Sequence, residues 1–259
     1  MFKVIPLFSG SSGNSIYIKY GNDEVLIDAG VSCKMLRTAL NSIGTDLQNI
    51  KAVFVTHEHS DHIKGLEIIS KKFGIPVYIN QKSLDAIEKP SAYTLIKENA
   101  CIKNAGEYAD VGEIHADIFK TPHDSFGSVG YRFTFSDGVS LGYATDMGYV
   151  TKSIASSLFG CDTVLLESNH DIQMHKNGPY PYYLKERILS AKGHLSNADC
   201  AAFIPFLYKN GTKKVILSHL SEHNNTPYIA YGTSLDALSE AGIDMREFSL
   251  TVAKKSILS

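Results

Sequence analysis

The chain has few cysteines and no long apolar run. Its 259 residues include four cysteines, and no two of them form a CxxC pair. Scattered thiols of this kind argue against a disulfide framework and are typical of reduced cysteines in a cytoplasmic protein. No segment has the roughly 20 apolar residues that cross a bilayer, and the N-terminus lacks an apolar signal segment. We therefore expect a cytoplasmic protein without a membrane partner.

The charge is nearly balanced, and no compositional break divides the chain. Lysine and arginine total 25 against 27 acidic residues, a net charge of −2. No basic field therefore covers the whole surface, although a local patch beside metal ions could still attract nucleic acid. The hydrophobic fraction of 44% supports a large core. Repeats, low-complexity tracts and Pro/Ser-rich linkers are missing, so we predict one domain over residues 1–259.

Short segments rich in Val, Ile, Tyr and Phe alternate with segments of helical periodicity. The predicted strands are 3–7, 15–20, 24–28, 52–56, 77–80, 114–120, 130–135, 140–144, 163–167 and 214–218. The predicted helices are 33–43, 63–73, 81–87, 182–190, 197–208 and 226–241, with Asn197 as an N-cap. Many strands come early and helices lie between them, which predicts a layered α+β sandwich.

A cluster of metal-type side chains follows one predicted strand. Segment 56–62 reads Thr-His-Glu-His-Ser-Asp-His. Imidazole and carboxylate are ligands that suit Zn²⁺, Mn²⁺ and Fe²⁺. His57 and His59 can point the same way from an extended loop, whereas Asp61 and His62 begin a new element and can face a second ion. The motif therefore predicts two half-sites.

Three more metal-type residues, His123, Asp146 and His219, each follow a predicted strand. Taken alone, His123 or His219 would more often be a histidine that binds no metal. Beside the motif, the three residues complete two ligand sets. The predicted ligands are His57, His59 and His123 for one ion, Asp61, His62 and His219 for the other, and Asp146 as a bridge. Seven ligands for two ions leave room for a bridging water, as in a catalytic site.

These ligands, together with Asp28 in the segment Leu-Ile-Asp-Ala-Gly at 26–30, resemble the metallo-β-lactamase superfamily. The resemblance implies a four-layer αβ/βα sandwich with a dinuclear metal site at one edge. The implied cofactors are two divalent ions, Zn²⁺ or Mn²⁺, with Fe²⁺ as a further option. Asp28 would steady the ligand loop, although a plain turn aspartate fits the same position. Only 73 positions separate Asp146 from His219, too few for the large inserted domain of the RNase J branch.

Further segments resemble nucleases of this superfamily. The run Gly-His-Leu-Ser-Asn at 193–197 resembles the Gly-His-Ser element of the tRNA 3′-processing nucleases. In that branch a glutamate holds the histidine that protonates the leaving oxygen, so Glu167 would orient His194; a capping or core histidine is the alternative. The loop 8–15, the segments 167–171 and 178–181 and the run 219–225 more closely resemble the YycJ/WalJ group. That resemblance implies a 5′→3′ DNA exonuclease.

Residues around these motifs could contact the substrate. The loop 9–15 is rich in Gly and Ser and could hold a phosphate, but a plain turn fits it equally well. Basic residues before His194 could contact the nucleic-acid backbone, or could form a solvated helix face. The predicted substrate-binding residues are Ser12, Asn14, Lys185, Arg187, Ser196 and Asn197. Asn224 would support the loop that carries His219.

We therefore expect a phosphodiesterase that uses a metal-bridging hydroxide, with Asp61, His194 and Glu167 as catalytic residues and DNA as its partner. The same ligands would suit a small-molecule (thio)ester hydrolase of the glyoxalase II type. The Glu167/His194 pair and the lack of a glyoxalase-like C-terminal domain favour the phosphodiesterase. A non-catalytic, metal-stabilised regulatory module is a third alternative, but such a module would be expected to have lost ligands. The sequence assigns no oligomeric state.

Overall fold

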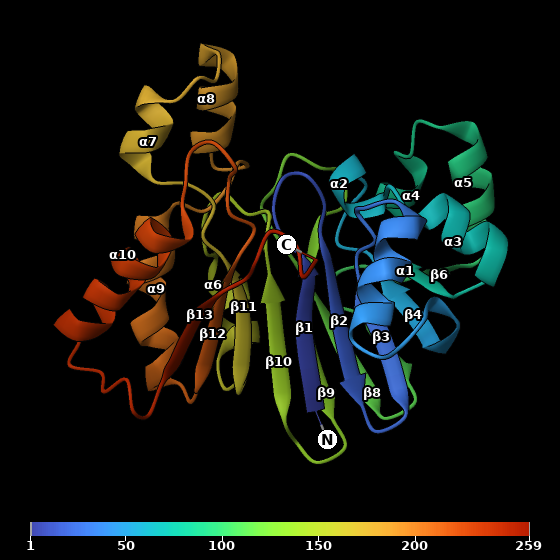
Figure 1. The fold of residues 1–259 in the computed structure, drawn as a ribbon, viewed down its shortest axis with the longest axis horizontal. Coiled ribbons are helices and arrows are strands. Elements are labelled where there is room, and N and C mark those ends of the chain that lie inside the picture. The colour runs from blue at the N-terminus through green and yellow to red at the C-terminus, as the bar shows by residue number, and fades with distance from the viewer. Residues whose placement is uncertain (1, 259) are drawn as a thin grey trace.

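The computed structural model describes residues 2–258, which form two β-sheets packed face to face with helices on both outer sides (Figure 1). The first sheet has the order β1 (Phe2–Phe8), β2 (Ser15–Tyr20), β3 (Asp23–Ile27), β4 (Ile50–Phe54), β5 (Val77–Ile79) and β6 (Ala100–Ile102). The second has the order β13 (Ser249–Val252), β12 (Lys214–Ser218), β11 (Thr163–Glu167), β10 (Ser140–Ala144), β9 (Val129–Phe135), β8 (Ile114–Lys120) and β7 (Tyr108–Val111).

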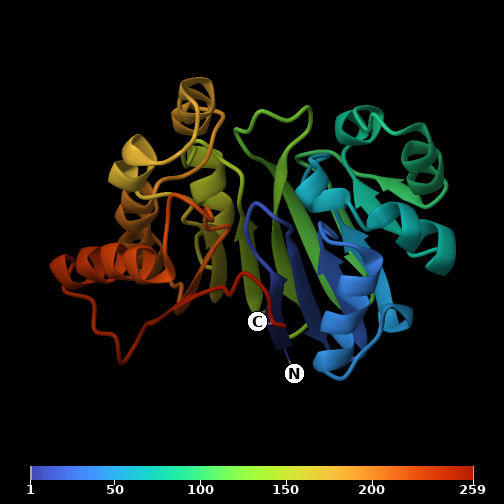
Figure 2. The same cartoon turned by 45° about the horizontal axis from the view of Figure 1, so that its top comes forward.

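Helices cover the outer face of each sheet. Those on the first sheet are α1 (Cys33–Ser42), α3 (Leu66–Phe73), α4 (Gln81–Asp85) and α5 (Pro90–Lys97). Those on the second are α6 (Lys152–Leu158), α9 (Asn197–Lys209) and α10 (Pro227–Glu240). The short elements are α2 (Ser60–Ile63), α7 (Ile172–Asn177), α8 (Tyr182–Leu189) and the 3-10 helix η1 (Leu47–Asn49). Figures 1 and 2 show α7 and α8 projecting beyond one edge of the sandwich.

Three apolar layers hold these elements together. Side chains alternate across each strand, so neighbouring residues enter different layers. On β4, Val53 packs against the helices of the first sheet, whereas Ala52 and Phe54 face the second sheet. On β11, Leu165 faces the first sheet and Val164 faces α9. The result is the four-layer α/β/β/α arrangement that the sequence predicts.

The carboxyl ends of the strands that precede the predicted ligands meet at one edge of the sandwich. Strands β3 and β4 are parallel, and so are β10, β11 and β12. Strand β8 is antiparallel to β9, which is antiparallel to β10, so β8 and β10 run in the same direction. Loops that leave these carboxyl ends are therefore the natural place for a site.

The last residues of the chain return to the first strand. Ser256 forms a β-bridge with Phe8, and the Ile257 amide donates to the Leu7 carbonyl over 2.9 Å. Contacts between the two ends of the chain, and the apolar layer shared by both sheets, support our proposal of a single domain. Residues 1 and 259 of the predicted range lie outside the described residues. Within residues 2–258, none of the helices combines the length and apolar character that a membrane span requires.

The structure corrects several predicted elements. Strands 15–20, 114–120, 140–144, 163–167 and 214–218 have the predicted bounds, but β6, β7, β13, α5, α6 and α7 were not predicted. The predicted helix 63–73 is two helices, because the Gly65 amide donates to the Ala29 carbonyl (2.8 Å) outside the helix. Ser196 rather than Asn197 is the N-cap of α9, and its Oγ accepts from the Asp199 amide (3.1 Å).

Phe54 lies in the layer between the sheets and tests how strongly that layer stabilises the fold. Its ring is fully buried, stacks on Tyr78 at 4.8 Å and meets Phe133 edge-on at 5.2 Å. We expect Phe54→Ala to lower the free energy of unfolding by about 3–5 kcal/mol, because it leaves a cavity where the rings met. Urea denaturation measures this change. Phe126 is 74% exposed, and Phe126→Ala should change stability by less than about 0.5 kcal/mol. Equal effects of the two substitutions on stability would contradict the assignment of Phe54 to the layer between the sheets.

Candidate metal centre

Three residues at strand ends have left-handed backbone angles. They are Asp28 (φ 60°), Asp146 (φ 55°) and His219 (φ 56°), which follow β3, β10 and β12. Within residues 2–258 no other residue besides glycine has a positive φ. A left-handed conformation costs a residue with a side chain roughly 1–3 kcal/mol, and such strain clusters at functional sites. All three residues belong to the site predicted from the sequence.

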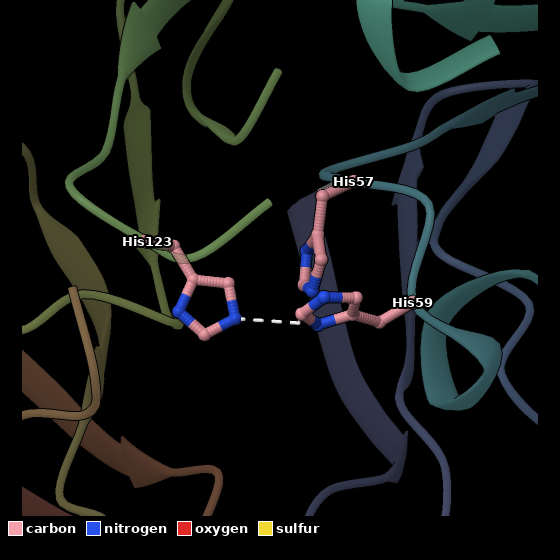
Figure 3. Close-up of side chains that lie close together, drawn as sticks. All are labelled: His57, His59 and His123. Carbon is pink, nitrogen blue, oxygen red and sulfur yellow. Dashed lines mark hydrogen bonds between the residues drawn. The ribbon is translucent and has the colours of Figure 1, made fainter. Parts of the chain in front are cut away.

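The first predicted ligand set is assembled from both sheets. His57 and His59 follow β4 of the first sheet, and His123 follows β8 of the second. Figure 3 shows that His123 approaches His57 and His59 from the opposite side. The distance from His123 Nε2 to His59 Nδ1 is 3.4 Å, and the ring centroids of His57 and His123 are 4.9 Å apart. The three imidazoles therefore surround one small space.

The second predicted ligand set lies beside the first, and Asp146 stands between them. His62 Nε2 is 3.4 Å from Asp61 Oδ2, and His219 Nε2 is 3.9 Å from the same oxygen. One oxygen of Asp146 lies 3.4 Å from His62 Nε2; the other lies 3.6 Å from His219 Nε2 and 3.8 Å from His123 Nε2. The carboxylate of Asp146 thus faces ligands of both sets.

Several buried atoms in this cluster form no hydrogen bond within residues 2–258. They are His57 Nε2, His219 Nε2 and Asp146 Oδ2. A buried polar atom left without a hydrogen bond costs free energy, so a group that occupies this space would stabilise it. Within each set of three, the candidate ligand atoms lie within 4.8 Å of one another. Their type and spacing suit divalent metal ions.

The cluster gathers several buried carboxylates at one place. Asp28, Asp146 and Glu167 are buried, Asp61 is partly so, and their ion-pair partners within residues 2–258 are all histidines. Burial by itself would lower the pKa of His219, but nearby carboxylates, Asp146 foremost, raise that pKa to about 10. Divalent cations compete with such protons for the same nitrogen atoms.

Hydrogen bonds behind the imidazoles fix their orientation. Asp28 Oδ2 is 2.8 Å from His62 Nδ1, and the Thr56 amide donates to Asp28 Oδ1 over 2.8 Å. His123 Nδ1 lies 3.1 Å from the Gly193 carbonyl oxygen. Since a carboxylate or carbonyl oxygen can only accept, each Nδ1 carries the proton. The Nε2 atoms of His62 and His123 are therefore left to bind a metal.

Glu167 holds two histidines at once. Its Oε1 lies 2.8 Å from His194 Nδ1 and 3.0 Å from His219 Nδ1. Its Oε2 accepts from the backbone amides of Met147 (2.9 Å) and Leu195 (3.1 Å). The structure places Glu167 beside His194, as the sequence predicts. The contact with His219 was not predicted, because nothing in the sequence shows that β11 and β12 are neighbours.

The N-terminal loop lies against the ligands. Asn14 was predicted to bind substrate, but it is buried, and its Oδ1 accepts from the Gly10 amide (2.9 Å). Its Nδ2 is 3.4 Å from Asp61 Oδ2 and 3.1 Å from His62 Nε2. Asn14 is thus placed to hold ligands rather than a phosphate. Ser12 lines a neighbouring cavity.

The predictions for the segments after His194 and His219 also need correction. Ser196 and Asn197 are buried, and Asn197 Oδ1 accepts from Ser168 Oγ over 2.7 Å, so neither faces the substrate. Asn224 contacts the loop that carries His219 through its backbone amide, which donates to Ser221 Oγ over 3.3 Å, whereas its side chain lies 3.3 Å from His175 Nδ1. The backbone of His219 is held by Asn169, whose Nδ2 donates to the His219 carbonyl over 2.9 Å, and by Ser9, whose Oγ accepts from the His219 amide over 2.8 Å. The sequence marked Asn169 only as a neighbour of Glu167.

A cavity of about 230 Å³ opens onto the cluster. Loops at the strand ends form its floor, and α8 with the segment before it forms one wall. The lining residues are Ser11, His59, Asp61, Asp146, Asn169, Tyr180, Leu184, Arg187, Ile188, His194, His219 and Ser221. Of the two predicted basic contacts, Arg187 lines this cavity, whereas the Lys185 ammonium donates to the Lys176 carbonyl (2.7 Å).

Asp28 provides a test of the metal centre that leaves every candidate ligand in place. We expect Asp28→Asn to weaken metal binding roughly 10- to 100-fold, because His62 loses the carboxylate that orients its ring. Metal content at fixed free metal concentration, measured by mass spectrometry, checks this. The matched control is Asp23→Asn at the other end of β3, where the carboxylate pairs with Lys51. Undiminished metal affinity in Asp28→Asn would refute the proposal that Asp28 orients His62 for metal binding.

Comparisons with known proteins agree with this geometry. Residues 23–220 match the family described as the beta-lactamase superfamily domain. Exodeoxyribonuclease WalJ of Streptococcus pneumoniae is 36% identical over 252 residues, covering 95% of this chain and 93% of that protein. Exodeoxyribonuclease YycJ of Bacillus anthracis is 34% identical over 241 residues, covering 93% and 90%. The solved structure of the metallo-β-lactamase fold protein YhfI from Bacillus subtilis superposes with a TM-score of 0.71 at 15% identity, covering 99% and 98%. The predicted fold is thereby confirmed, and the chain belongs to the metallo-β-lactamase superfamily, within the group that includes WalJ and YycJ.

Proposed function

We propose that this protein is a metal-dependent phosphodiesterase that degrades DNA as a 5′→3′ exonuclease. The observation that carries the proposal is the pair formed by Glu167 and His194 beside the metal cluster. Hydrolysis of an ordinary phosphodiester expels a strongly basic alkoxide, and a histidine held beside the leaving oxygen can protonate it. The names of the relatives WalJ and YycJ, both exodeoxyribonucleases, support DNA as the substrate.

Two divalent ions fit the cluster best. One would be held by His57, His59 and His123, the other by Asp61, His62 and His219, with Asp146 shared. Nitrogen and oxygen ligands of this kind suit Zn²⁺ and Mn²⁺, and also Fe²⁺. When bound, the cations supply Lewis-acid chemistry, lowering the pKa of a water and offsetting charge on the phosphate oxygens.

His194 is positioned to deliver a proton into the cavity. Its Nδ1 is occupied by Glu167, whereas its Nε2 forms no hydrogen bond within residues 2–258. The side chain is 19% exposed and lines the cavity. The backbone amide of His194 donates to the Ile188 carbonyl over 3.0 Å, which ties the residue to the end of α8. The ring therefore presents Nε2 to a bound substrate.

Asp61 lines the same cavity. Its Oδ2 is near Asn14 Nδ2 and His62 Nε2, and Oδ1 has no hydrogen-bond partner within residues 2–258. A quarter of the side chain is exposed, and the residue lines the cavity. We propose that this carboxylate accepts a hydrogen bond from the attacking water. Asp61 would then serve both as a ligand and as an orienting group.

The first experiment compares substrates. With Zn²⁺ or Mn²⁺ added, we expect cleavage of end-labelled DNA from the 5′ end, loss of activity with a chelator, and recovery when metal is returned. Single- and double-stranded DNA and RNA, with and without a 5′-phosphate, should be assayed beside a thioester substrate. Rapid thioester hydrolysis without phosphodiester cleavage under any metal condition would replace the proposal with the glyoxalase-type alternative. Bound metal without either activity would favour the regulatory module.

His194→Ala tests the proton-donor role separately from metal binding. We expect turnover on DNA to fall roughly 100- to 10,000-fold, the usual contribution of general acid catalysis, with unchanged metal content. Turnover of a nitrophenyl phosphodiester should fall much less, because its leaving group needs no proton. The matched control is His115→Ala, which removes a half-exposed histidine paired with Asp110 on the β7–β8 hairpin. Equal losses of turnover on DNA and on the nitrophenyl phosphodiester would contradict the role of His194 as proton donor.

A further inference from the structure

Arg187 is the only lysine or arginine among the described residues that line the metal cavity. It lies in the last turn of α8, and its neighbour Ile188 accepts the hydrogen bond from the His194 amide. The backbone next to Arg187 is thereby hydrogen-bonded to the backbone of the proposed proton donor. The other acidic and basic lining residues are the ligand residues and His194, so Arg187 supplies the fixed positive charge on this wall.

The guanidinium is held from behind by Asp124. Arg187 Nε donates to Asp124 Oδ2, and Asp124 itself does not line the cavity. The ion pair raises the pKa of Arg187 and lowers that of Asp124 despite partial burial of the carboxylate. Of the five N–H donors of an arginine, only the one on Nε is used. Neither Nη atom forms a hydrogen bond within residues 2–258.

Asp124 also touches the metal cluster. It directly follows His123 in sequence, and its Oδ1 lies 3.3 Å from His123 Nε2. One carboxylate therefore spans the distance between the guanidinium on α8 and an imidazole of the first ligand set. This contact fixes the distance between Arg187 and the cluster. A surface arginine on a free helix face would have no such constraint.

We propose that Arg187, oriented by Asp124, forms a phosphate subsite that makes the cavity select phosphate-bearing substrates. The proposal rests on the proposed function and names its specificity-determining residue. A guanidinium whose Nε is fixed presents its two Nη groups as a fork, and a fork of N–H donors matches two phosphate oxygens. Asp124 is a positioning residue here, because it acts on the substrate only through Arg187. A neutral thioester would gain nothing from this subsite.

Kinetics of matched variants test the subsite. We expect Arg187→Ala to raise KM for single-stranded DNA roughly 10- to 100-fold while kcat changes little, since a charge-assisted pair is lost. The slope of log KM against log salt should fall in size by about 0.7. Arg187→Lys should restore only part of the affinity, because an ammonium lacks the fork. The control is Lys213→Ala, which removes an exposed lysine that pairs with Asp162 away from the cavity and should leave KM and the salt slope unchanged.

Asp124→Asn tests the positioning role. It should raise KM by a smaller factor than Arg187→Ala, and in an Arg187→Ala background it should have no further effect. Metal content should stay at the wild-type level in every variant. Full additivity of the two substitutions in their effects on KM, or loss of metal from Asp124→Asn, would overturn the positioning role of Asp124. An unchanged KM in Arg187→Ala would overturn the phosphate subsite.

A binding measurement separates this proposal from the proposed function. Calorimetry with thymidine 5′-monophosphate and metal-loaded protein requires no turnover. Weaker binding by Arg187→Ala than by wild type supports the subsite even if no substrate is cleaved, in which case the proposed function fails alone. Cleavage of DNA with equal nucleotide binding by both proteins supports the proposed function and overturns the subsite.

Discussion

The structure depends on one electrostatic constraint. Three carboxylates, those of Asp28, Asp146 and Glu167, are buried at a single edge of the sandwich, and no lysine or arginine within residues 2–258 forms an ion pair with them. Burying a carboxylate without a partner is costly, so the fold must supply hydrogen bonds, protonated imidazoles or cations. Divalent cations can meet this requirement, because buried atoms of His57, His219 and Asp146 that form no hydrogen bond within residues 2–258 belong to the groups that could hold a metal ion.

The sandwich makes such a concentration of charge possible by placing each group on a strand end. Strands from both sheets deliver their loops to the same edge, so residues about 160 positions apart, such as His57 and His219, reach one site. Left-handed backbone at Asp28, Asp146 and His219 accompanies this arrangement. The strain is tolerated because the strands before these residues are hydrogen-bonded on both sides within their sheets.

Contacts behind the ligands link metal binding to the proposed chemistry. Glu167 contacts both His194 and His219, so the residue that orients the proton donor also orients a candidate ligand. Asp124 contacts both Arg187 and His123 in a similar way. Substrate contacts and metal contacts therefore share carboxylates. Shared carboxylates of this kind keep the distances between the groups short and fixed.

The sequence by itself determined the fold class and which residues gather at the site. Short segments rich in Val, Ile, Tyr and Phe marked most strands. HxHxDH with His123, Asp146 and His219 marked the ends of the strands that carry the site, because ligand chemistry restricts those positions to His and Asp. Short elements such as β6 and α7 were missed, because they pack on neighbours distant in sequence and have little periodicity of their own.

Tertiary structure alone decided what each polar residue near the site does. Asn14, Ser196 and Asn197 resembled substrate contacts in the sequence, yet the fold buries all three. Asp124 carried no sequence signal, and Asn169 was marked only as a neighbour of Glu167 at the border of the site. Both acquire roles because α8 and the loop after β12 lie beside them. A motif fixes which atoms can bind, but the direction in which a side chain points depends on neighbours that only the packing of the two sheets provides.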